Sequence, residues 1–243
     1  MSAPRFYCSA PLAPDATIEL PAPLAHHALR VLRLKPETAI VLFDGLGGQY
    51  PSTLLIDGKR AYARTGALQP IDVELPGHIT LAQGIPSGDK MDWVIEKAVE
   101  LGAARLIPIE AQRSVPQLGG DRLRKRMEHW RRVAQSASEQ CGRNRLMEIS
   151  EPISLAACLK SQDTDAQTLF CHPEAAQSLP DALDRSTDRI RLLVGPEGGW
   201  SPQEQDLVEQ AGLTPMRFGN RVLRTETAGI ALISAVSALR GWE

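Results

Sequence analysis

Residues 195–199, Gly-Pro-Glu-Gly-Gly, directly follow the apolar run Leu192-Leu193-Val194. Glycines at the end of a strand let the backbone approach a ligand closely, and free N–H groups then point outward. The next residues, Ser201-Pro202-Gln203-Glu204, form a capping box, in which Ser201 and Glu204 fix the start of a helix. The loop is therefore a candidate ligand site, although a tight turn without a ligand could have the same composition.

This loop differs from the glycine motifs that bind nucleotide phosphates. It lacks the lysine and the spacing of a Walker loop, and it does not fit the G-x-G-x-x-G pattern. We therefore do not expect a triphosphate or a dinucleotide here. Its one carboxylate, Glu197, either takes part in chemistry or fixes the loop by bonding its own backbone, and the sequence leaves both roles open.

A second junction of the same kind lies between residues 217 and 239, RFGNRVLRTETAGIALISAVSAL. A short strand runs through a Gly-Asn turn into a helix whose start carries Arg224 and Glu226. The body of this helix is rich in small residues, which would let a partner helix or a threaded segment approach closely. Two such junctions predict one shared site at the carboxyl ends of parallel strands.

The composition is that of an ordinary soluble globular protein, with 43% hydrophobic and 23% charged residues among 243. No apolar run reaches the roughly 18 to 20 residues of a membrane span, and no signal-peptide core follows the first residues. We therefore expect a cytoplasmic protein. The four cysteines are scattered without a C-x-x-C pair, so we expect reduced thiols and no metal.

The net charge is only −2, but its distribution is uneven. Residues 113–145 hold nine basic and three acidic residues, a net charge of +6, which is the pattern of a phosphate-binding surface. The basic side chains of the helix at 121–140 could instead simply solvate its outer face, with Met127, Trp130 and Val133 as the buried stripe. We favour phosphate contact, and the predicted RNA-binding residues are Arg5, Arg30, Arg33, Arg124, Lys125, Arg126 and Arg145.

Residues 1–72 show the short, partly alternating runs of a small β-barrel. The expected strands are at 17–20, 38–45, 49–59 and 60–68. One helix, predicted at 24–34 and ended by Pro36, places Leu24, Ala28, Val31 and Leu32 on one face.

Residues 73–243 alternate between strands and helices, which predicts an α/β domain with a mostly parallel sheet covered on both faces. The stretch 69–78 is the expected boundary between the two domains. The strands are expected around 78–85, 105–110, 167–172, 189–195 and 215–219, and the helices at 89–102, 121–140, from 202, and to about 240.

Three motifs in this order carry a family resemblance: EQCGRNR at 139–145, LLVGPEGGWSPQE at 192–204 and FGNRVLRTETA at 218–228. Together they resemble the RsmE type of SPOUT-class RNA methyltransferases, which methylate uridine N3 in 16S ribosomal RNA. RFYC, HALRVLRL and LFDG near the start resemble the family's PUA-like N-terminal barrel, and GDKMDWVIEKAVELGA resembles its first catalytic-domain helix. The resemblance covers nearly the whole chain.

The resemblance implies a deep trefoil knot in the C-terminal domain, a homodimer packed through the knot region, and S-adenosyl-L-methionine bound in a bent shape by the knot loops. It implies 16S ribosomal RNA or the small ribosomal subunit as the partner. Carried over to this sequence, the cofactor-binding residues are Phe170, Cys171, His172, Val194, Gly195, Pro196, Glu197, Gly198, Gly199, Phe218, Gly219, Val222, Leu223 and Arg224.

Methylation of uridine N3 requires removal of an imide proton, so a carboxylate base or a cation near O2 or O4 would assist it. Glu226 and Arg224 are the candidates for these roles, with Arg143 as a second cation; for Glu226, favourable helix N-terminal electrostatics is the alternative. Cys141 is interpreted as structural, because N3 needs no covalent intermediate. A different acceptor, such as a ribose 2′-hydroxyl, and a non-catalytic RNA-binding or ribosome-assembly factor remain open.

Overall fold

The computed structural model describes residues 3–114, 119–161 and 165–242. It divides into two compact units, which we describe separately. The smaller unit comprises Met1–Glu74 and Ser138–Leu146, and the larger one Leu75–Ala137 and Met147–Glu243. The smaller unit is therefore built from two separate stretches of the chain.

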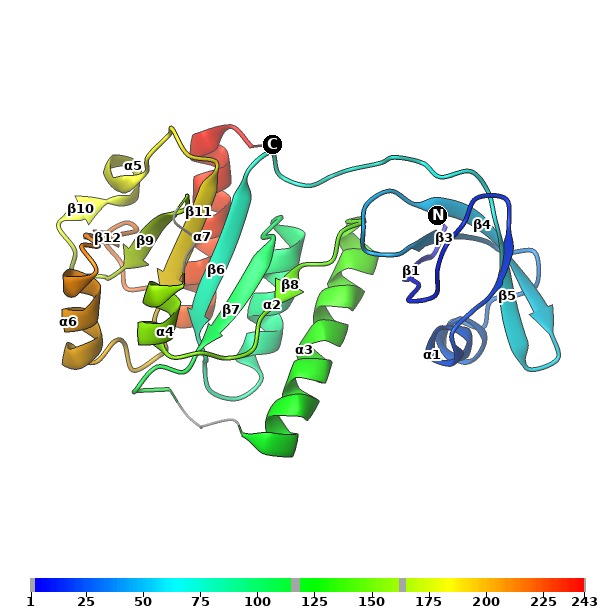
Figure 1. The fold of residues 1–243 in the computed structure, drawn as a ribbon, viewed down its shortest axis with the longest axis horizontal. Coiled ribbons are helices and arrows are strands. Elements are labelled where there is room, and N and C mark those ends of the chain that lie inside the picture. Colours follow the sequence, from blue (N-terminus) through cyan, green and yellow to red (C-terminus); the bar gives the residue numbers. More distant parts are fainter. Residues whose placement is uncertain (1–2, 115–118, 162–164, 243) are drawn as a thin grey trace. The chain divides into compact units, whose positions relative to one another are not determined.

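The larger unit contains a parallel sheet, seven-stranded within the described residues, in the order β10-β12-β9-β11-β6-β7-β8 (Figure 1). Its strands are β6 (His78–Gly84), β7 (Arg105–Ile109), β8 (Glu148–Ile149), β9 (Gln167–Cys171), β10 (Gln177–Ser178), β11 (Arg189–Val194) and β12 (Pro215–Arg217). The central strands β6 and β11 are buried along most of their length, which explains their continuous apolar runs. The predicted α/β fold class is confirmed.

Helices cover both faces of this sheet: α2 (Lys90–Glu100), α3 (Gly120–Cys141), α4 (Leu155–Lys160), α5 (Leu179–Ala182), α6 (Pro202–Gln210) and α7 (Thr225–Arg240). On one face α7 packs against α2 and over β6 and β11, and α4 and α6 meet on the other (Figure 1). β12 lies outside β9, so the chain turns back from β12 to place α7 over the central strands. This return brings the two glycine-containing junctions together.

The smaller unit contains a five-stranded sheet, within the described residues, in the order β1-β3-β4-β5-β2. Its strands are β1 (Arg5–Tyr7), β2 (Thr17–Glu19), β3 (Ala39–Phe43), β4 (Tyr50–Asp57) and β5 (Arg60–Thr65). All neighbours are antiparallel except β1 and β3. Phe6, Leu42 and Leu54 form the centre of its core.

The predicted helix at 24–34 begins and ends earlier than expected and is not a continuous α-helix. It consists of α1 (Ala22–His26) followed by a π-helical turn, η1 (His27–Val31), in which Leu32 N–H donates to His27 O. Leu24 and Ala28 are buried as predicted, but Val31 and Leu32 are exposed. The wider i→i+5 turn breaks the 3.6-residue period on which that prediction rested.

Residues 138–146 pack into the smaller unit through polar contacts. Arg143 forms a buried ion pair with Glu74, and Asn144 donates to Ile71 O at 2.9 Å. Arg5 donates to Asn144 Oδ1 at 2.6 Å and to Gly142 O at 3.1 Å. These contacts join the first strand and the 71–74 segment to a stretch distant in sequence. Among the described residues no helix combines the length and the apolar character needed to cross a bilayer.

Candidate functional site

A pocket of about 640 Å³ lies beside the ends of β9 and β11. Four pieces of the chain dominate the walls of the pocket: residues 171–174, residues 194–200, residues 218–224 without Asn220, and the start of α7 from Thr225 to Ala228 without Thr227. Lys90, Arg113 and Gln205 complete the lining. The position matches the predicted one, at the carboxyl ends of parallel strands and between the two glycine-containing junctions.

Close packing rather than turn geometry accounts for two glycines of this region, strictly at Gly84 and more weakly at Gly195. A Cβ on Gly84, at the end of β6, would lie 2.5 Å from Pro196 N, and one on Gly195 would lie 3.0 Å from Trp200 Nε1. The glycine loop, residues 195–199, therefore lies directly against β6. Gly199 alone in this loop has the left-handed backbone conformation, with φ of +66°.

The capping box after the loop is confirmed. Ser201 Oγ accepts from Glu204 N–H at 3.2 Å, and Glu204 Oε2 accepts from Ser201 N–H at 2.9 Å. The other carboxylate oxygen of Glu204 accepts from Gln112 N–H at 3.0 Å. Both capping residues are buried. The carboxylate of Glu204 thus joins the start of α6 to the segment that follows β7.

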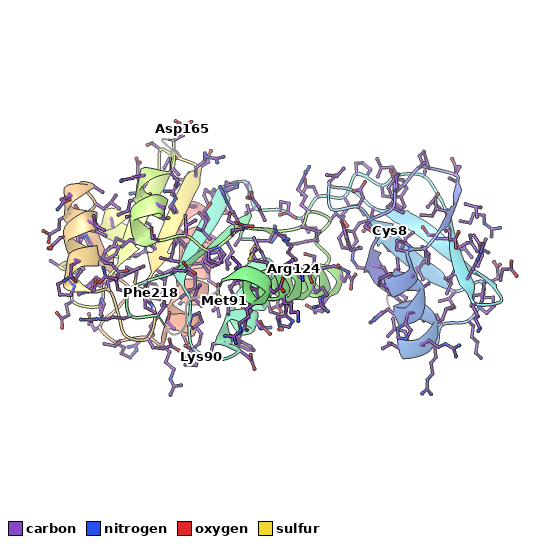
Figure 2. All side chains as sticks on the ribbon, turned by 60° about the horizontal axis from the view of Figure 1, so that its bottom comes forward. Cys8, Lys90, Met91, Arg124, Asp165 and Phe218 are labelled. Atoms are coloured by element: carbon purple, nitrogen blue, oxygen red, sulfur yellow. The ribbon has the colours of Figure 1, made fainter. Side chains whose placement is uncertain are left out.

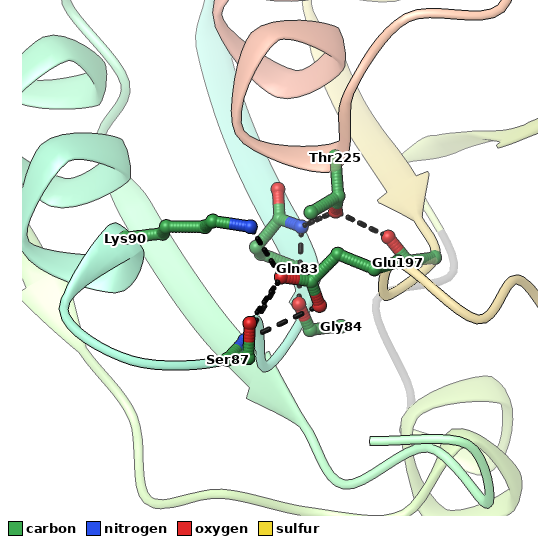
Figure 3. A network of polar contacts seen from close by, with 7 residues as sticks. Gln83, Gly84, Ser87, Lys90, Glu197 and Thr225 are labelled. Carbon is green, nitrogen blue, oxygen red and sulfur yellow. Dashed lines mark hydrogen bonds and ion pairs between the residues drawn. The ribbon is translucent and has the colours of Figure 1, made fainter. Parts of the chain in front are cut away.

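Glu197 fixes the glycine loop to the segment before α2. Its carboxylate accepts from Ser87 N–H at 3.1 Å, from Ser87 Oγ–H at 2.7 Å and from Lys90 Nζ at 2.8 Å (Figure 3). Partial burial acts to raise the pKa of Glu197, but the hydrogen bonds from Lys90 and Ser87 outweigh it and lower the pKa from 4.5 to about 2. A carboxylate so strongly held as an anion is a poor proton acceptor, so its role is to anchor the loop.

A second, buried contact holds the first residue of the loop. Thr225 Oγ1 donates to Gly195 O, and Gln83 Nε2 donates to Thr225 Oγ1 at 2.8 Å (Figure 3). Thr225 is the first residue of α7, and Gln83 is the penultimate residue of β6. Sequence reasoning missed both residues as parts of the site, because neither stands in a motif that indicates this contact.

The start of α7 places two predicted catalytic residues at the pocket. Arg224 is the N-cap residue of α7 and is exposed, while Glu226 is half-buried in the first turn. Both line the pocket. The Oε2 atom of Glu226 is buried and has no hydrogen-bond partner among the described residues. A cationic and an anionic residue thus flank Thr225 in the sequence, and both line the same pocket.

The structure brings all but one of the predicted cofactor-binding residues to this pocket. The exception is Phe170, which does not line the pocket; its buried ring packs against His172 and Trp200. Phe170 ends up behind the wall because successive side chains of β9 point to opposite faces. Burial raises the pKa of the neighbouring Cys171 thiol to about 11, so this thiol stays protonated and inert at neutral pH.

Arg143 is not brought to this pocket. It was predicted as a second cation beside Glu226, but it belongs to the smaller unit, where its Nε donates to Glu74 Oε1 at 3.0 Å. Its side chain is only 5% exposed. The motif at 139–145 thus supplies internal contacts of the smaller unit, a role that its basic composition did not indicate.

The predicted RNA-binding residues differ in exposure. Arg30, Arg33, Arg124 and Lys125 are exposed, and Arg126 is half-buried; Figure 2 shows Arg124 on α3. Arg5 is half-buried and bonded to Asn144 within the smaller unit, whereas Arg145 is exposed and donates to Leu46 O at 2.7 Å. Arg124 in turn forms surface ion pairs with Asp121 and Glu128. Over the part of the chain that is described, no group of three or more His, Cys, Asp or Glu residues could hold a metal ion.

Sequence reasoning missed several other pocket residues: Lys90, Arg113, Pro173, Glu174, Trp200, Gln205, Arg221 and Ala228. Of these, Pro173, Trp200 and Arg221 directly adjoin predicted cofactor residues, which was an available signal. Arg113 lies far away in sequence, yet its Nη1 donates to Gly198 O at 3.1 Å. A Cβ on Gly198 would lie 3.0 Å from the Cβ of Arg113, so this glycine also permits a close contact.

Comparison with known proteins places both units in families. A family described as the RNA methyltransferase domain matches residues 73–237, and one described as the RNA methyltransferase PUA domain matches residues 20–65. The ribosomal RNA small subunit methyltransferase E of Buchnera aphidicola subsp. Schizaphis graminum is 32% identical over 96% of this chain and 95% of its own.

Two solved structures resemble this one along nearly their whole length. One is the ribosomal RNA small subunit methyltransferase E of Neisseria gonorrhoeae bound to S-adenosyl methionine, with 36% identity, a TM-score of 0.90 and 98% of both chains covered. The other is a Legionella pneumophila protein in complex with the bound cofactor SAM, with 30% identity, a TM-score of 0.93 and 98% of both chains covered. The chain therefore belongs to the RNA methyltransferase family of ribosomal RNA small subunit methyltransferase E.

Proposed function

We propose that this protein transfers a methyl group from S-adenosyl-L-methionine to N3 of a uridine in 16S ribosomal RNA. Small-subunit ribosomal RNA methylation is the activity of the family to which the chain belongs. The observation that carries the proposal is the pocket itself, in which the backbone of residues 195–199, the 218–224 segment and the start of α7 face one space. The uridine N3 acceptor follows from the sequence resemblance and from the residues at the α7 end.

The pocket residues fit the cofactor. Its volume of about 640 Å³ is in the range of small-molecule sites. The glycine loop presents backbone groups to the pocket, while Val194, Val222 and Leu223 supply apolar contacts. The cofactor-binding residues are proposed to be Cys171, His172, Val194 to Gly199, Phe218, Gly219 and Val222 to Arg224, with Phe170 supporting them from behind.

When bound, S-adenosylmethionine supplies an electrophilic methyl group, so the chain itself must orient the acceptor and manage one proton. Glu226 is proposed to accept the N3 proton, since its carboxylate lines the pocket and Oε2 has no partner among the described residues. Arg224, on the same side, would stabilise the negative charge that develops on O2 or O4. Glu197 is unsuited to the base role because Lys90 and Ser87 hold it.

The RNA is proposed to contact exposed basic side chains outside the pocket. Arg124, Lys125 and Arg126 lie near the start of α3, and Arg30 and Arg33 belong to the smaller unit, whose family is an RNA methyltransferase PUA domain. Phosphate contacts of this kind position RNA without reading its sequence. Arg5 contributes less to RNA binding, because its half-buried guanidinium is bonded to Asn144 and Gln49 within the smaller unit. Arg145 is exposed and is proposed as an RNA contact.

We further propose that the chain forms a trefoil knot and a homodimer through the knot region, and that it acts in the cytoplasm. The return of the chain from the outer strand β12 to α7 over β11 and β6 supports threading of this kind. Close packing of α7 on β6 goes with this return of the chain, since a Cβ on Gly229 would lie 3.1 Å from the Leu81 side chain of β6. The homodimer itself rests on the sequence resemblance.

Nucleoside analysis of small-subunit RNA from a deletion strain tests the proposed function. Loss of 3-methyluridine, restored by the wild-type gene but not by a Glu226→Gln variant, is the expected result. Loss of a ribose-methylated nucleoside instead would assign a 2′-hydroxyl acceptor, and an unchanged profile would refute the methylation of 16S RNA. Calorimetric titration of the purified protein with S-adenosylmethionine separates an enzyme from a non-catalytic RNA-binding protein.

A further inference from the structure

Thr225 connects the two sides of the pocket. Its hydroxyl donates to the carbonyl of Gly195, the first residue of the glycine loop. Its chain neighbours are Arg224 and Glu226, which both line the pocket. Thr225 itself is 6% exposed. One buried side chain thus links the cofactor side of the site to the acceptor side.

The chemistry of the groups determines the direction of both hydrogen bonds. The Gly195 carbonyl can only accept, so the single hydroxyl proton of Thr225 must go to it. The remaining contact of Thr225 Oγ1 is with Gln83 Nε2, which can only donate. Gln83 Nε2 also donates to Gly84 O at 3.1 Å, and these two acceptors together fix the orientation of the amide. The hydroxyl therefore has one rotamer that satisfies every partner.

The buried side chain of Gln83 destabilises the folded state at one atom, so stability alone does not explain a glutamine at this position. Its side chain is completely buried, yet Oε1 has no hydrogen-bond partner within the described ranges. A buried polar atom without a partner destabilises the folded state, and an apolar side chain of similar shape would avoid this cost. Gly229, one turn after Thr225, leaves room for the amide, since a Cβ there would lie 3.0 Å from Oε1. The unpaired Oε1 and the space that Gly229 leaves for the amide both favour a role for Gln83 in positioning Thr225.

We propose that Gln83 and Thr225 are positioning residues that set Glu226 and Arg224 at a fixed place relative to the glycine loop. This rests on the proposed function, because it assigns the two sides of the pocket to methyl donor and acceptor. The contacts of Glu197 with Ser87 and Lys90 have a different effect from the Thr225 contact. They join the glycine loop to the start of α2 and involve no residue of α7. Loss of the Thr225 contact should therefore reduce the rate of transfer more than the affinity for the cofactor.

Thr225→Val tests the proposal, because valine keeps the shape and removes the hydroxyl. We expect the single-turnover rate at saturating S-adenosylmethionine and RNA to fall on the order of 100-fold, the effect of a misplacement of about 1 Å. The calorimetric affinity for S-adenosylmethionine should fall only about fivefold, the equivalent of one hydrogen bond. Thr225→Ser, which restores the donor, should recover most of the rate.

Thr227→Val is the matched control, since Thr227 lies in the same helical turn but is exposed and absent from the pocket. Its rate and affinity should equal those of the wild type. Gln83→Met provides a second arm if Thr225→Val does not fold. Its rate should fall in the same direction, and its combination with Thr225→Val should be non-additive, because both changes act through one hydroxyl. Thermal unfolding of each variant checks the fold.

Two results would overturn the proposal: a Thr225→Val rate equal to that of Thr227→Val, or equal losses in Thr225→Val and Thr225→Ser. Failure of the proposed function is distinguishable from both. If the wild type methylates no uridine N3, the function is wrong. Hydrogen exchange at the backbone N–H groups of Gly195 and of residues 197–199 then still reports on the Thr225–Gly195 contact. This exchange must be faster in Thr225→Val than in Thr227→Val if Thr225 holds the glycine loop in place.

Discussion

Replacing Arg143 by methionine should destabilise the smaller unit strongly. Arg143 and Glu74 form a two-point ion pair, and their side chains are 5% and 18% exposed. Methionine would leave the Glu74 carboxylate buried without its partner, which costs about 3–5 kcal/mol. For a unit of this size each kcal/mol lowers the melting temperature by about 4–8 °C, so even the lower figure predicts a decrease of about 12–24 °C.

Differential scanning calorimetry of the full chain measures this effect. Arg60→Met serves as the matched control, because Arg60 pairs with Glu19 in the same unit at 3.9 Å with both side chains largely exposed. Such a surface pair contributes about 1 kcal/mol at most. Replacing Arg143 and Glu74 together by apolar residues should recover part of the loss, since no buried charge then remains unpaired.

Calorimetric titration of Arg143→Met with S-adenosylmethionine, below its melting temperature, should give the wild-type affinity. An affinity reduced as much as that of a pocket variant would return Arg143 to the catalytic site. A melting temperature no lower than that of Arg60→Met would refute the argument from burial. Either result would show that the motif at 139–145 does more than stabilise the smaller unit through internal contacts.

Four further predictions concern the larger unit. The pKa of Glu197 is lowered from 4.5 to about 2, so the ionised Glu197 carboxylate stabilises the folded state fully above pH 4.5 and loses this effect as the pH falls through 2. The difference in melting temperature between wild type and Glu197→Gln should therefore stay constant down to about pH 5 and then narrow. Glu226→Gln should lower the single-turnover rate by about 10²- to 10⁴-fold and leave calorimetric cofactor affinity nearly unchanged; a wild-type rate would exclude it as the base. Iodoacetamide at about pH 8 should modify Cys171 only after unfolding, as peptide mass spectrometry would show, because burial keeps the thiol protonated. Glutamines at residues 124–126 should weaken RNA binding and reduce the slope of log affinity against log salt by up to about 2–3, with no change in cofactor affinity; an unchanged slope would place the RNA elsewhere.

Local patterns in the sequence predicted the features that depend on neighbours in the chain. The capping box at Ser201 and the strand-to-helix junctions follow from residues a few positions apart, and the structure contains them as expected. Contacts between distant segments left no such signal. Glu197 bonds Ser87, 110 positions away, and the sequence offered only its own backbone as a partner.

The errors in the prediction have physical causes of the same kind. The π-helical turn at 27–31 keeps the composition of an α-helix, so the exposure of Val31 could not be read from spacing. The basic motif at 139–145 resembled a phosphate-binding surface because its partner, Glu74, is distant in sequence. Charge patterns locate basic residues, but only burial separates an internal ion pair from a surface that binds RNA.

The contact between Gln83 and Thr225 also limits when the pocket can form during protein synthesis. The two residues are 142 positions apart, so a ribosome that adds 5–20 residues per second needs roughly 7–28 s to pass from one to the other. During this interval Gln83 has neither the Thr225 hydroxyl nor the β11 and α7 segments that pack against β6 in the folded protein. The nascent chain therefore acquires its cofactor site only once α7 has emerged, and an incomplete chain would not sequester the methyl donor.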